Sequence, residues 1–251
     1  MMHPNILNRF DLAGRTAIIT GGARGIGLEI GRTLSMAGAS IILADLDLET
    51  VKKAAVGVGP DVKAFQCDVT DPQSVRDLAA AIGACPDILV NNAGVVRVAP
   101  TKDTSDDDWH FVTSVNLNGV FHCCKTFGVA MAERGSGNVV NIGSMCGSIV
   151  VRPQNGPAYN ASKAGVHMLT KTFACEWAKS GVRVNAIAPG YISTEMTSDP
   201  SYEISTWVEL TPMGRFGRTD EVASVVHFLA SDASSYMTGS VISVDGGYTC
   251  W

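Results

Sequence analysis

The sequence predicts an α/β fold, with one doubly wound parallel sheet of about seven strands and helices on both of its faces. Along the 251 residues, apolar runs of strand length alternate with longer segments of helical periodicity, the order that produces parallel sheets. The strand-length runs are apolar throughout, as expected for strands buried on both faces. No internal repeat, low-complexity segment or clear linker divides the chain, so we expect residues 1–251 to form a single domain.

Each expected strand is a short run rich in apolar residues. Ligands of a doubly wound sheet bind at the carboxyl ends of such strands, near the point where the strand order reverses. The residues that follow each run are therefore the first place to look for a site. The seven runs are residues 15–20, 40–45, 62–68, 87–94, 137–144, 182–190 and 241–247.

The helices are expected between the strands, where apolar residues recur at helical spacing. Asp71 and Pro72 form a typical helix start, with an N-cap aspartate before a proline in the first turn. Gly38 is a typical helix stop. A loop-rich stretch, 191–217, precedes the last helix. The expected helices are residues 25–38, 47–59, 70–85, about 106–133, 158–181 and about 219–231.

Composition and charge exclude several classes of protein. The formal net charge is -5 and the Lys and Arg residues form no basic run, so we expect neither nucleic acid nor an anionic membrane as a partner. No apolar stretch approaches the roughly 20 residues of a membrane span, and the first residues lack a signal-peptide pattern; we expect a soluble, cytoplasmic protein. The cysteine spacing favours free thiols, and the histidine spacing does not indicate a zinc site.

A glycine-rich turn, TGGARGIG at residues 20–27, joins the first expected strand to the first expected helix. Glycines allow a tight turn and let a pyrophosphate approach bare backbone. The N–H groups and the positive dipole end of the following helix attract that anion. The turn therefore predicts a Rossmann-type dinucleotide site. Its expected contacts are Gly21, Arg24, Gly25, Ile26 and Gly27.

Asp45, at the end of the second strand, bears on the choice between NAD and NADP. A carboxylate here accepts hydrogen bonds from the adenosine ribose and repels a 2′-phosphate, which favours NAD. A helix N-cap is an alternative role, because DLDLET follows. Arg24 argues in the other direction, because a cation in the glycine turn attracts a 2′-phosphate. We give Asp45 more weight, because a like-charge contact costs more than a missing attraction.

The next two strand ends add to the expected cofactor site. CDVTD (67–71) closes the third strand and NNAG (91–94) closes the fourth. Both lie at the edge of the sheet that a cofactor would occupy. Their expected contacts are Asp68, Val69, Asn91 and Gly94.

Tyr159 and Lys163, in AYNASKAG, share one helix face because they are four residues apart. A phenol with a pKa near 10 is a poor base at neutral pH. A nearby ammonium favours the phenolate and lowers that pKa, and a nicotinamide cation would lower it further. The pair thus predicts a general base for removing an alcohol proton, and a general acid in reverse.

A series of motifs resembles that of the short-chain dehydrogenases/reductases, in the same order and from about residue 10 to residue 251. The resemblance implies a nicotinamide-dependent oxidoreductase with Tyr159 as general acid/base and Lys163 also holding the cofactor ribose. It implies further cofactor contacts at Pro189, Gly190, Ile192 and Thr194. The motifs are TGGARGIG, LAD, CDVTD, NNAG, VNLNGVF, NIGSMCG, YNASK, RVNAIAPG and VDGGY.

By the same resemblance, a serine after the fifth strand orients the substrate oxygen, and Ser144 holds that place. It lies 15 residues before Tyr159, whereas many family members have about 13, the position of Cys146 here. We prefer Ser144 because it follows the strand directly; Ser148 is a poorer candidate. An asparagine that holds a proton-relay water matches Asn116, with Asn118 as the nearby alternative.

The substrate region resembles that of bacterial polyol dehydrogenases of the galactitol and arabinitol type. This implies NAD-dependent oxidation of a secondary hydroxyl in a sugar alcohol or vicinal diol. Residues 191–217 resemble the family's substrate lid. The expected substrate contacts are Ser144, Cys146, Gln154, Asn155 and Tyr159.

The resemblance also implies a homotetramer. No metal-binding residue is predicted, and a divalent metal ion held by terminal carboxylates near Trp251 is an alternative that the resemblance leaves open. Two rival functions remain open from the sequence. One is an NADPH-dependent ketoreductase such as a 3-oxoacyl-carrier-protein reductase, which Arg24 favours. The other is a catalytically inactive NAD-binding regulator, which the presence of both Tyr159 and Lys163 disfavours.

Overall fold

The computed structural model describes residues 3–198 and 204–250. A seven-stranded sheet in the order β3-β2-β1-β4-β5-β6-β7 forms its centre, and each neighbouring pair of strands is parallel. The strand order reverses between β1 and β4, which lie side by side. The strands are β1 (Thr16–Thr20), β2 (Ser40–Asp45), β3 (Lys63–Gln66), β4 (Ile88–Asn91), β5 (Gly137–Ile142), β6 (Val182–Pro189) and β7 (Val241–Val244).

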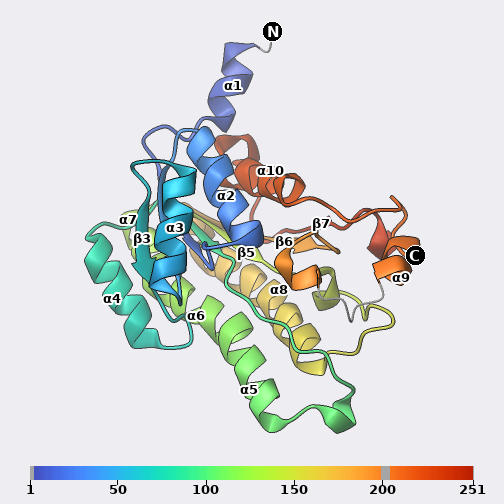
Figure 1. Ribbon diagram of the computed structural model, residues 1–251. Helices are drawn as coiled ribbons and strands as arrows, with labels where there is room; N and C mark the ends of the chain where they lie inside the picture. Colours follow the sequence, from blue (N-terminus) through green and yellow to red (C-terminus); the bar gives the residue numbers. More distant parts are fainter. Residues whose placement is uncertain (1–2, 199–203, 251) are drawn as a thin grey trace.

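Two helical layers cover the sheet (Figure 1). One layer holds α2 (Gly25–Met36), α3 (Leu48–Val58) and α10 (Thr219–Ala230). The other holds α4 (Pro72–Ile82), α5 (Asp106–Thr113), α6 (Gly119–Cys123), α7 (Val129–Arg134) and α8 (Pro157–Trp177). Each layer encloses its own apolar core, because successive strand residues point to opposite faces. On β1, Ile19 joins the first core and Ile18 the second.

The predicted doubly wound parallel sheet is confirmed, and the observed strands lie within the predicted runs. The helix expected over about 106–133 is a continuous helical rod in which π-helical turns at 114–118 and 124–128 separate α5, α6 and α7. Two short helices were not predicted: α1 (Pro4–Phe10) and α9 (Ile204–Glu209). α1 buries none of its side chains and projects from the molecule (Figure 1), and its seven residues are too few to establish a helical periodicity.

No helix in the described parts of the chain combines the length and apolar character needed to cross a membrane.

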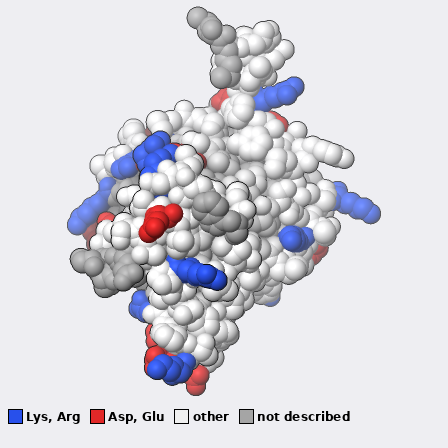
Figure 2. Space-filling view, turned by 90° about the vertical axis from the view of Figure 1, so that its right-hand side faces the viewer, with Lys and Arg blue, Asp and Glu red and all other residues white. Residues whose placement is uncertain are grey.

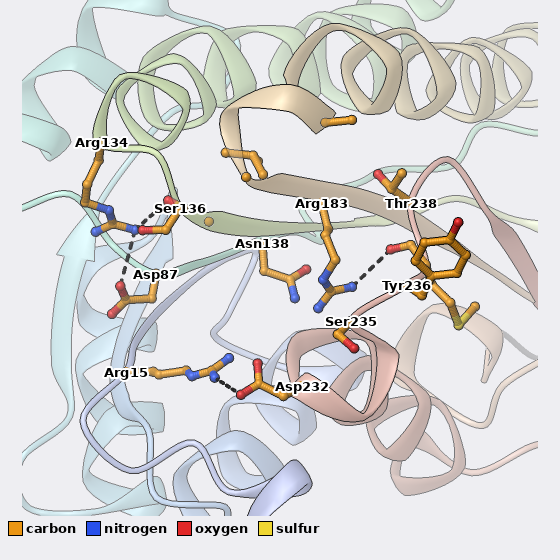
Figure 3. A pocket seen from close by; sticks show the side chains of 15 residues that line it. Arg15, Asp87, Arg134, Ser136, Asn138, Arg183, Asp232, Ser235, Tyr236 and Thr238 are labelled. Atoms are coloured by element: carbon orange, nitrogen blue, oxygen red, sulfur yellow. Dashed lines mark hydrogen bonds and ion pairs between the residues drawn. The ribbon is translucent and has the colours of Figure 1, made fainter.

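The amino ends of the strands surround a cavity of about 790 Å³ that contains three arginines (Figure 3). Arg15 forms an ion pair with Asp232 at 2.7 Å, and Arg134 forms one with Asp87 at 3.2 Å. Arg183 donates hydrogen bonds to three carbonyl oxygens around the carboxyl end of α10: those of Leu229 (2.8 Å), Ser231 (3.1 Å) and Met237 (3.1 Å). The guanidinium groups therefore bind this end of the fold together.

We expect Arg183→Met to lower the free energy of unfolding by about 1–3 kcal/mol, because it removes the partly buried hydrogen bonds of a charged donor to the carbonyls of Leu229, Ser231 and Met237. Urea denaturation measures this loss. Arg32→Met is the matched control: it removes an exposed ion pair with Glu29 and should cost less than about 1 kcal/mol. Equal unfolding midpoints for the two variants would contradict the structural role of Arg183.

Candidate active site

The glycine-rich turn closes tightly between β1 and α2. Gly21 and Gly25 have φ angles of +62° and +53°, in the left-handed region that favours glycine. A Cβ on Gly27 would overlap the carbonyl oxygen of Gly21 and the side chain of Asn92. Asn92 Nδ2 donates to the carbonyls of Thr20 (3.0 Å) and Gly21 (2.8 Å). This packing leaves the first turn of α2 available to an anion.

Asp45 ends β2 beside this turn. Its carboxylate accepts hydrogen bonds from the backbone N–H groups of Ala23 (3.0 Å) and Leu46 (2.8 Å). Asp47, not Asp45, caps α3 by accepting from the backbone of Glu49 and Thr50. The alternative role of Asp45 as the N-cap is therefore excluded. The Asp45 carboxylate therefore lies next to the glycine turn.

Arg24, in the same turn, points toward the segment that follows β6. Its guanidinium lies 3.6 Å from the Glu195 carboxylate, and both side chains are about three-quarters exposed. Thr194 lies across from Gly25, with its methyl group 3.7 Å from where a Cβ on Gly25 would be. The glycine turn and residues 194–195 therefore lie next to each other.

The other expected cofactor contacts gather at the same strand ends. The Asp68 carboxylate accepts from the backbone and hydroxyl of Thr70 (2.9 and 2.7 Å), which fixes the loop after β3. Gly94 faces the catalytic helix: a Cβ there would lie 3.4 Å from Asn116 Oδ1 and 3.6 Å from Lys163 Nζ. Val69 and Ile192 are buried beside these loops, and Ile26 is partly buried on α2. Pro189 is the last residue of β6, and Gly190 follows it.

The side chain of Asn91, one of the expected cofactor contacts, points away from the glycine turn. The Asn91 side chain is buried, and it donates to Asn141 Oδ1 at 2.8 Å and Cys124 Sγ at 3.3 Å. It therefore points into the core between the sheet and α8 and not toward the glycine turn. Asn92, which the sequence analysis passed over, points to the glycine turn instead. The alternation of side chains at the end of a strand was the signal that could have separated the two.

Tyr159 and Lys163 lie on one face of α8, as their spacing predicted. Lys163 Nζ is 5.8 Å from the centroid of the Tyr159 ring. The lysine is 5% exposed, and its ammonium group donates to the carbonyl of Ile142, the last residue of β5, at 2.8 Å. Ser144 follows two residues later; its hydroxyl accepts from the Cys146 backbone N–H at 3.1 Å, and its side chain lies close enough to Tyr159 to influence the pKa of the phenol.

Burial dominates the electrostatics of this pair. It raises the pKa of Tyr159 well above its usual value, with the Cys146 thiol adding to the rise and the Ser144 side chain opposing it. Burial also lowers the pKa of Lys163 to about 8. Without a bound cofactor, burial is thus the largest influence on the pKa of Tyr159, and the ammonium group of Lys163 is directed at Ile142.

Asn116 lies in the first π-helical turn and is fully buried. Its Oδ1 accepts from the backbone N–H of Val95 at 2.8 Å, and its Nδ2 donates to the Val95 carbonyl (2.9 Å) and Ser162 Oγ (3.2 Å). Asn118, the nearby alternative, is exposed. Such π-helical turns are frequent at functional sites, because the extra residue changes where side chains point. Here the turn directs the amide toward Gly94 and the catalytic helix.

Comparison with known proteins decides the family. A family model described as enoyl-(acyl carrier protein) reductase matches residues 21–249. The chain is 46% identical to the galactitol 2-dehydrogenase (L-tagatose-forming) of Cereibacter sphaeroides, an alignment that covers 96% of this chain and 98% of that protein. The chain belongs to the short-chain dehydrogenase/reductase family.

Solved structures agree with this assignment. The crystal structure of gox2181 superposes with a TM-score of 0.95 at 44% identity, covering 98% of this chain and 99% of that one. A gluconate 5-dehydrogenase from Burkholderia cenocepacia, in complex with NADP and tartrate, superposes with a TM-score of 0.90 at 38% identity and covers 98% and 99%. This short-chain dehydrogenase/reductase is therefore an oxidoreductase that uses a nicotinamide cofactor. The glycine turn fits that group. Cβ atoms on Gly21 and Gly27 would overlap Ala93, the Gly21 carbonyl and Asn92, and would open the tight turn that leads into the N-terminus of α2.

Aromatic side chains build the substrate end of this short-chain dehydrogenase/reductase. Tyr191 stacks on Trp207 with ring centroids 4.4 Å apart, and Tyr248 meets Tyr191 edge-on at 5.6 Å. The Tyr191 hydroxyl donates to Gln154 Oε1 at 3.4 Å. Gln154 was predicted as a substrate contact. Tyr191 and Tyr248 were not, since their contacts join residues far apart in the chain. These rings and Gln154 form one wall near Cys146.

Two other expectations concern the remaining parts of the substrate end. Asn155 is exposed, and Ser148 bonds to His167 and not to Tyr159. Residues 199–203 of the expected lid, 191–217, lie outside the described residues, as does Trp251. Within residues 3–198 and 204–250, no group of three or more His, Cys, Asp or Glu residues is arranged to hold a metal ion.

Gly27→Ala tests the glycine turn. We expect it to weaken NADH binding and to lower the free energy of unfolding by about 1–3 kcal/mol, because the new methyl group must displace Gly21 or Asn92. Gly57→Ala, at an exposed position of α3, is the control and should stabilise the protein by about 0.4–1 kcal/mol. NADH fluorescence titration and thermal unfolding measure both effects; unchanged NADH binding in Gly27→Ala would show that the turn does not contact the cofactor.

Proposed function

We propose that this protein is a polyol dehydrogenase that reversibly oxidises a secondary hydroxyl of a sugar alcohol or vicinal diol to the ketone, with NAD as the cofactor. The single observation that carries the proposal is the arrangement of Ser144, Tyr159 and Lys163 at the carboxyl ends of the strands, where Lys163 lies close to Gly94. The galactitol 2-dehydrogenase relative supports a polyol as the substrate class. The wall of aromatic and amide groups supports it too, because it offers both apolar contact and hydrogen bonds.

In the proposed reaction, the Ser144 hydroxyl orients the substrate oxygen and Tyr159 removes its proton as the C=O bond forms. The nicotinamide, when bound, supplies the acceptor for the hydride that leaves the carbinol carbon, and its positive charge favours the tyrosinate. Lys163 holds the cofactor ribose and stabilises the deprotonated phenol. Asn116 holds a water molecule through which the proton continues to solvent. In the ketone-reducing direction Tyr159 returns the proton.

The charge of the surface fits a neutral substrate. On the face that carries α9 and the C-terminal end, the described residues include both basic and acidic side chains, among many uncharged ones (Figure 2). A sugar alcohol or diol needs no countercharge. This surface therefore supports a small neutral substrate more than a charged one.

Tyr159→Phe should lower kcat for alcohol oxidation by about 10²–10⁴-fold, because it removes the general base. NADH binding should change little, since the ring remains. In the wild type, the rate of oxidation should rise with pH, because burial raises the pKa of Tyr159 and the phenolate becomes more abundant as pH increases. Tyr236→Phe, at a fully exposed tyrosine, is the matched control. Wild-type turnover in Tyr159→Phe would overturn the catalytic assignment.

Asp45 supports NAD over NADP, because its carboxylate lies at the glycine turn while Arg24 is paired with Glu195. We expect kcat/KM with NAD⁺ to exceed that with NADP⁺ by at least about tenfold. Asp45→Asn should lower the ratio of kcat/KM for NAD⁺ to kcat/KM for NADP⁺, since it keeps a hydrogen-bond acceptor for the Ala23 N–H and removes the negative charge. Initial rates with both cofactors measure it; a preference of the wild type for NADP⁺ would favour the rival ketoreductase.

The rival 3-oxoacyl-carrier-protein reductase keeps one observation in its favour, the arginine within the glycine turn. An inactive NAD-binding regulator would have no use for the buried Lys163 that is aligned with Tyr159. A screen of sugar alcohols, diols and 3-oxoacyl substrates, followed by NADH or NADPH absorbance, separates the three functions.

We further propose that residues 1–251 act as one catalytic domain and assemble as a homotetramer. Large apolar side chains on the neighbouring helices α5, α6 and α8 support assembly, because they are at least 40% exposed: Trp109, Phe111, Phe121 and Met168. The expected metal ion involves Trp251 and so lies outside the described residues.

A further inference from the structure

His167 lies on α8, four residues after Lys163 and eight after Tyr159, so it shares their helix face. Its side chain is only 7% exposed. The histidine spacing in the sequence does not indicate a zinc site, and it predicts no other role for His167. Nothing in the proposed reaction uses this ring.

The ring packs against residues 143–148, here called the Ser144 turn. A Cβ on Gly143 would overlap His167 Nε2, and a Cβ on Gly147 would come within 2.7 Å of His167 Cε1. Glycine on both sides of Ser144 is therefore what admits the imidazole. The flat ring fills a slot between α8 and the backbone that carries Ser144.

The polar contacts of the ring are also unusual for a core position. Its Nδ1 lies 3.4 Å from Ser148 Oγ, at the end of the Ser144 turn. Its Nε2 is buried with no hydrogen-bond partner among the described residues. In either tautomer one buried ring nitrogen stays unpaired, a cost that an apolar side chain would avoid. Packing alone therefore does not account for a histidine here.

The ring is neutral at physiological pH. Burial lowers the pKa of His167, and the neighbouring Lys163 and Lys171 lower it further. A neutral imidazole can contact the backbone of Lys163 without placing a second positive charge beside its ammonium. The slot can thus be filled by a rigid group while the electrostatics of the catalytic pair are preserved.

We infer that His167 is a positioning residue, whose ring holds the Ser144 turn against α8 and thereby fixes the Ser144 hydroxyl relative to Tyr159. The inference rests on the proposed function, in which Ser144 orients the substrate. The internal bonds of the turn, from Gly147 N to the Ser144 carbonyl (2.9 Å) and from Cys146 N to the Ser144 hydroxyl (3.1 Å), shape it but do not attach it to α8. The His167 ring and its contact with Ser148 attach the turn to α8.

A double-mutant cycle tests this role. His167→Ala should lower kcat for polyol oxidation by about tenfold to a hundredfold, because Ser144 loses its fixed position. The dissociation constant of NADH should stay within about twofold, since the glycine turn is untouched. In a Ser144→Ala background, His167→Ala should lower kcat by less than about threefold, because there is no longer a hydroxyl to position.

The controls separate positioning from stability. Val166→Ala, at the preceding, fully buried residue of α8, should lower the unfolding temperature and leave kcat near the wild-type value. If His167→Ala does not fold, His167→Leu takes its place in the cycle, since it restores volume but not the flat shape or the bond to Ser148.

Two outcomes overturn the inference alone: an unchanged kcat in the His167 variant, or an equal loss of kcat in the Ser144 and Ser144→Ala backgrounds. The second would show that the ring only stabilises the fold. An unchanged kcat in Ser144→Ala would overturn the role of Ser144 in the proposed function, and the inference with it.

Discussion

The hydrogen bond from Lys163 Nζ to the carbonyl of Ile142 is the contact on which the geometry of the active site depends. It joins the middle of α8 to the last residue of β5, at a point where the lysine is 5% exposed. Because the chain continues from Ile142 into the Ser144 turn, the same bond fixes the start of that turn against α8, and the His167 ring holds the rest of it. A buried ammonium is costly to desolvate, so the backbone carbonyl and the surrounding helix must hold it in one place. That requirement fixes the site before any ligand enters.

The direction of the two pKa shifts shows what the protein leaves to its ligands. Burial disfavours the phenolate of Tyr159 and the ammonium of Lys163 alike. A site that kept both charges without a cofactor would have to stabilise them by many more polar contacts than the described residues provide. In the proposed reaction, a bound nicotinamide cation would supply the positive charge that the phenolate lacks. Proton removal by Tyr159 would then depend on the bound oxidant, and the tyrosine would stay protonated in its absence.

Local patterns predicted much of this molecule. The strands, the glycine turn and the Tyr159–Lys163 pair follow from periodicity and spacing, which depend on a few neighbouring residues. What the sequence did not predict depends on packing between distant segments. The burial that raises the pKa of Tyr159, the inward side chain of Asn91 and the slot around His167 each arise where α8 meets the sheet. No spacing rule reports how much solvent reaches such a contact.

The two ends of the sheet lie next to opposite kinds of backbone group. At the amino ends, the carboxyl terminus of α10 presents carbonyl oxygens, and Arg183 satisfies them from within the protein. At the carboxyl ends, the first turn of α2 presents N–H groups, and glycines keep its approaches clear of side chains. The protein closes the first end with its own cations and leaves the second to an anionic ligand. A cavity of about 790 Å³ therefore lies at the end that the arginines hold together, and the candidate site lies at the end where backbone donors remain available.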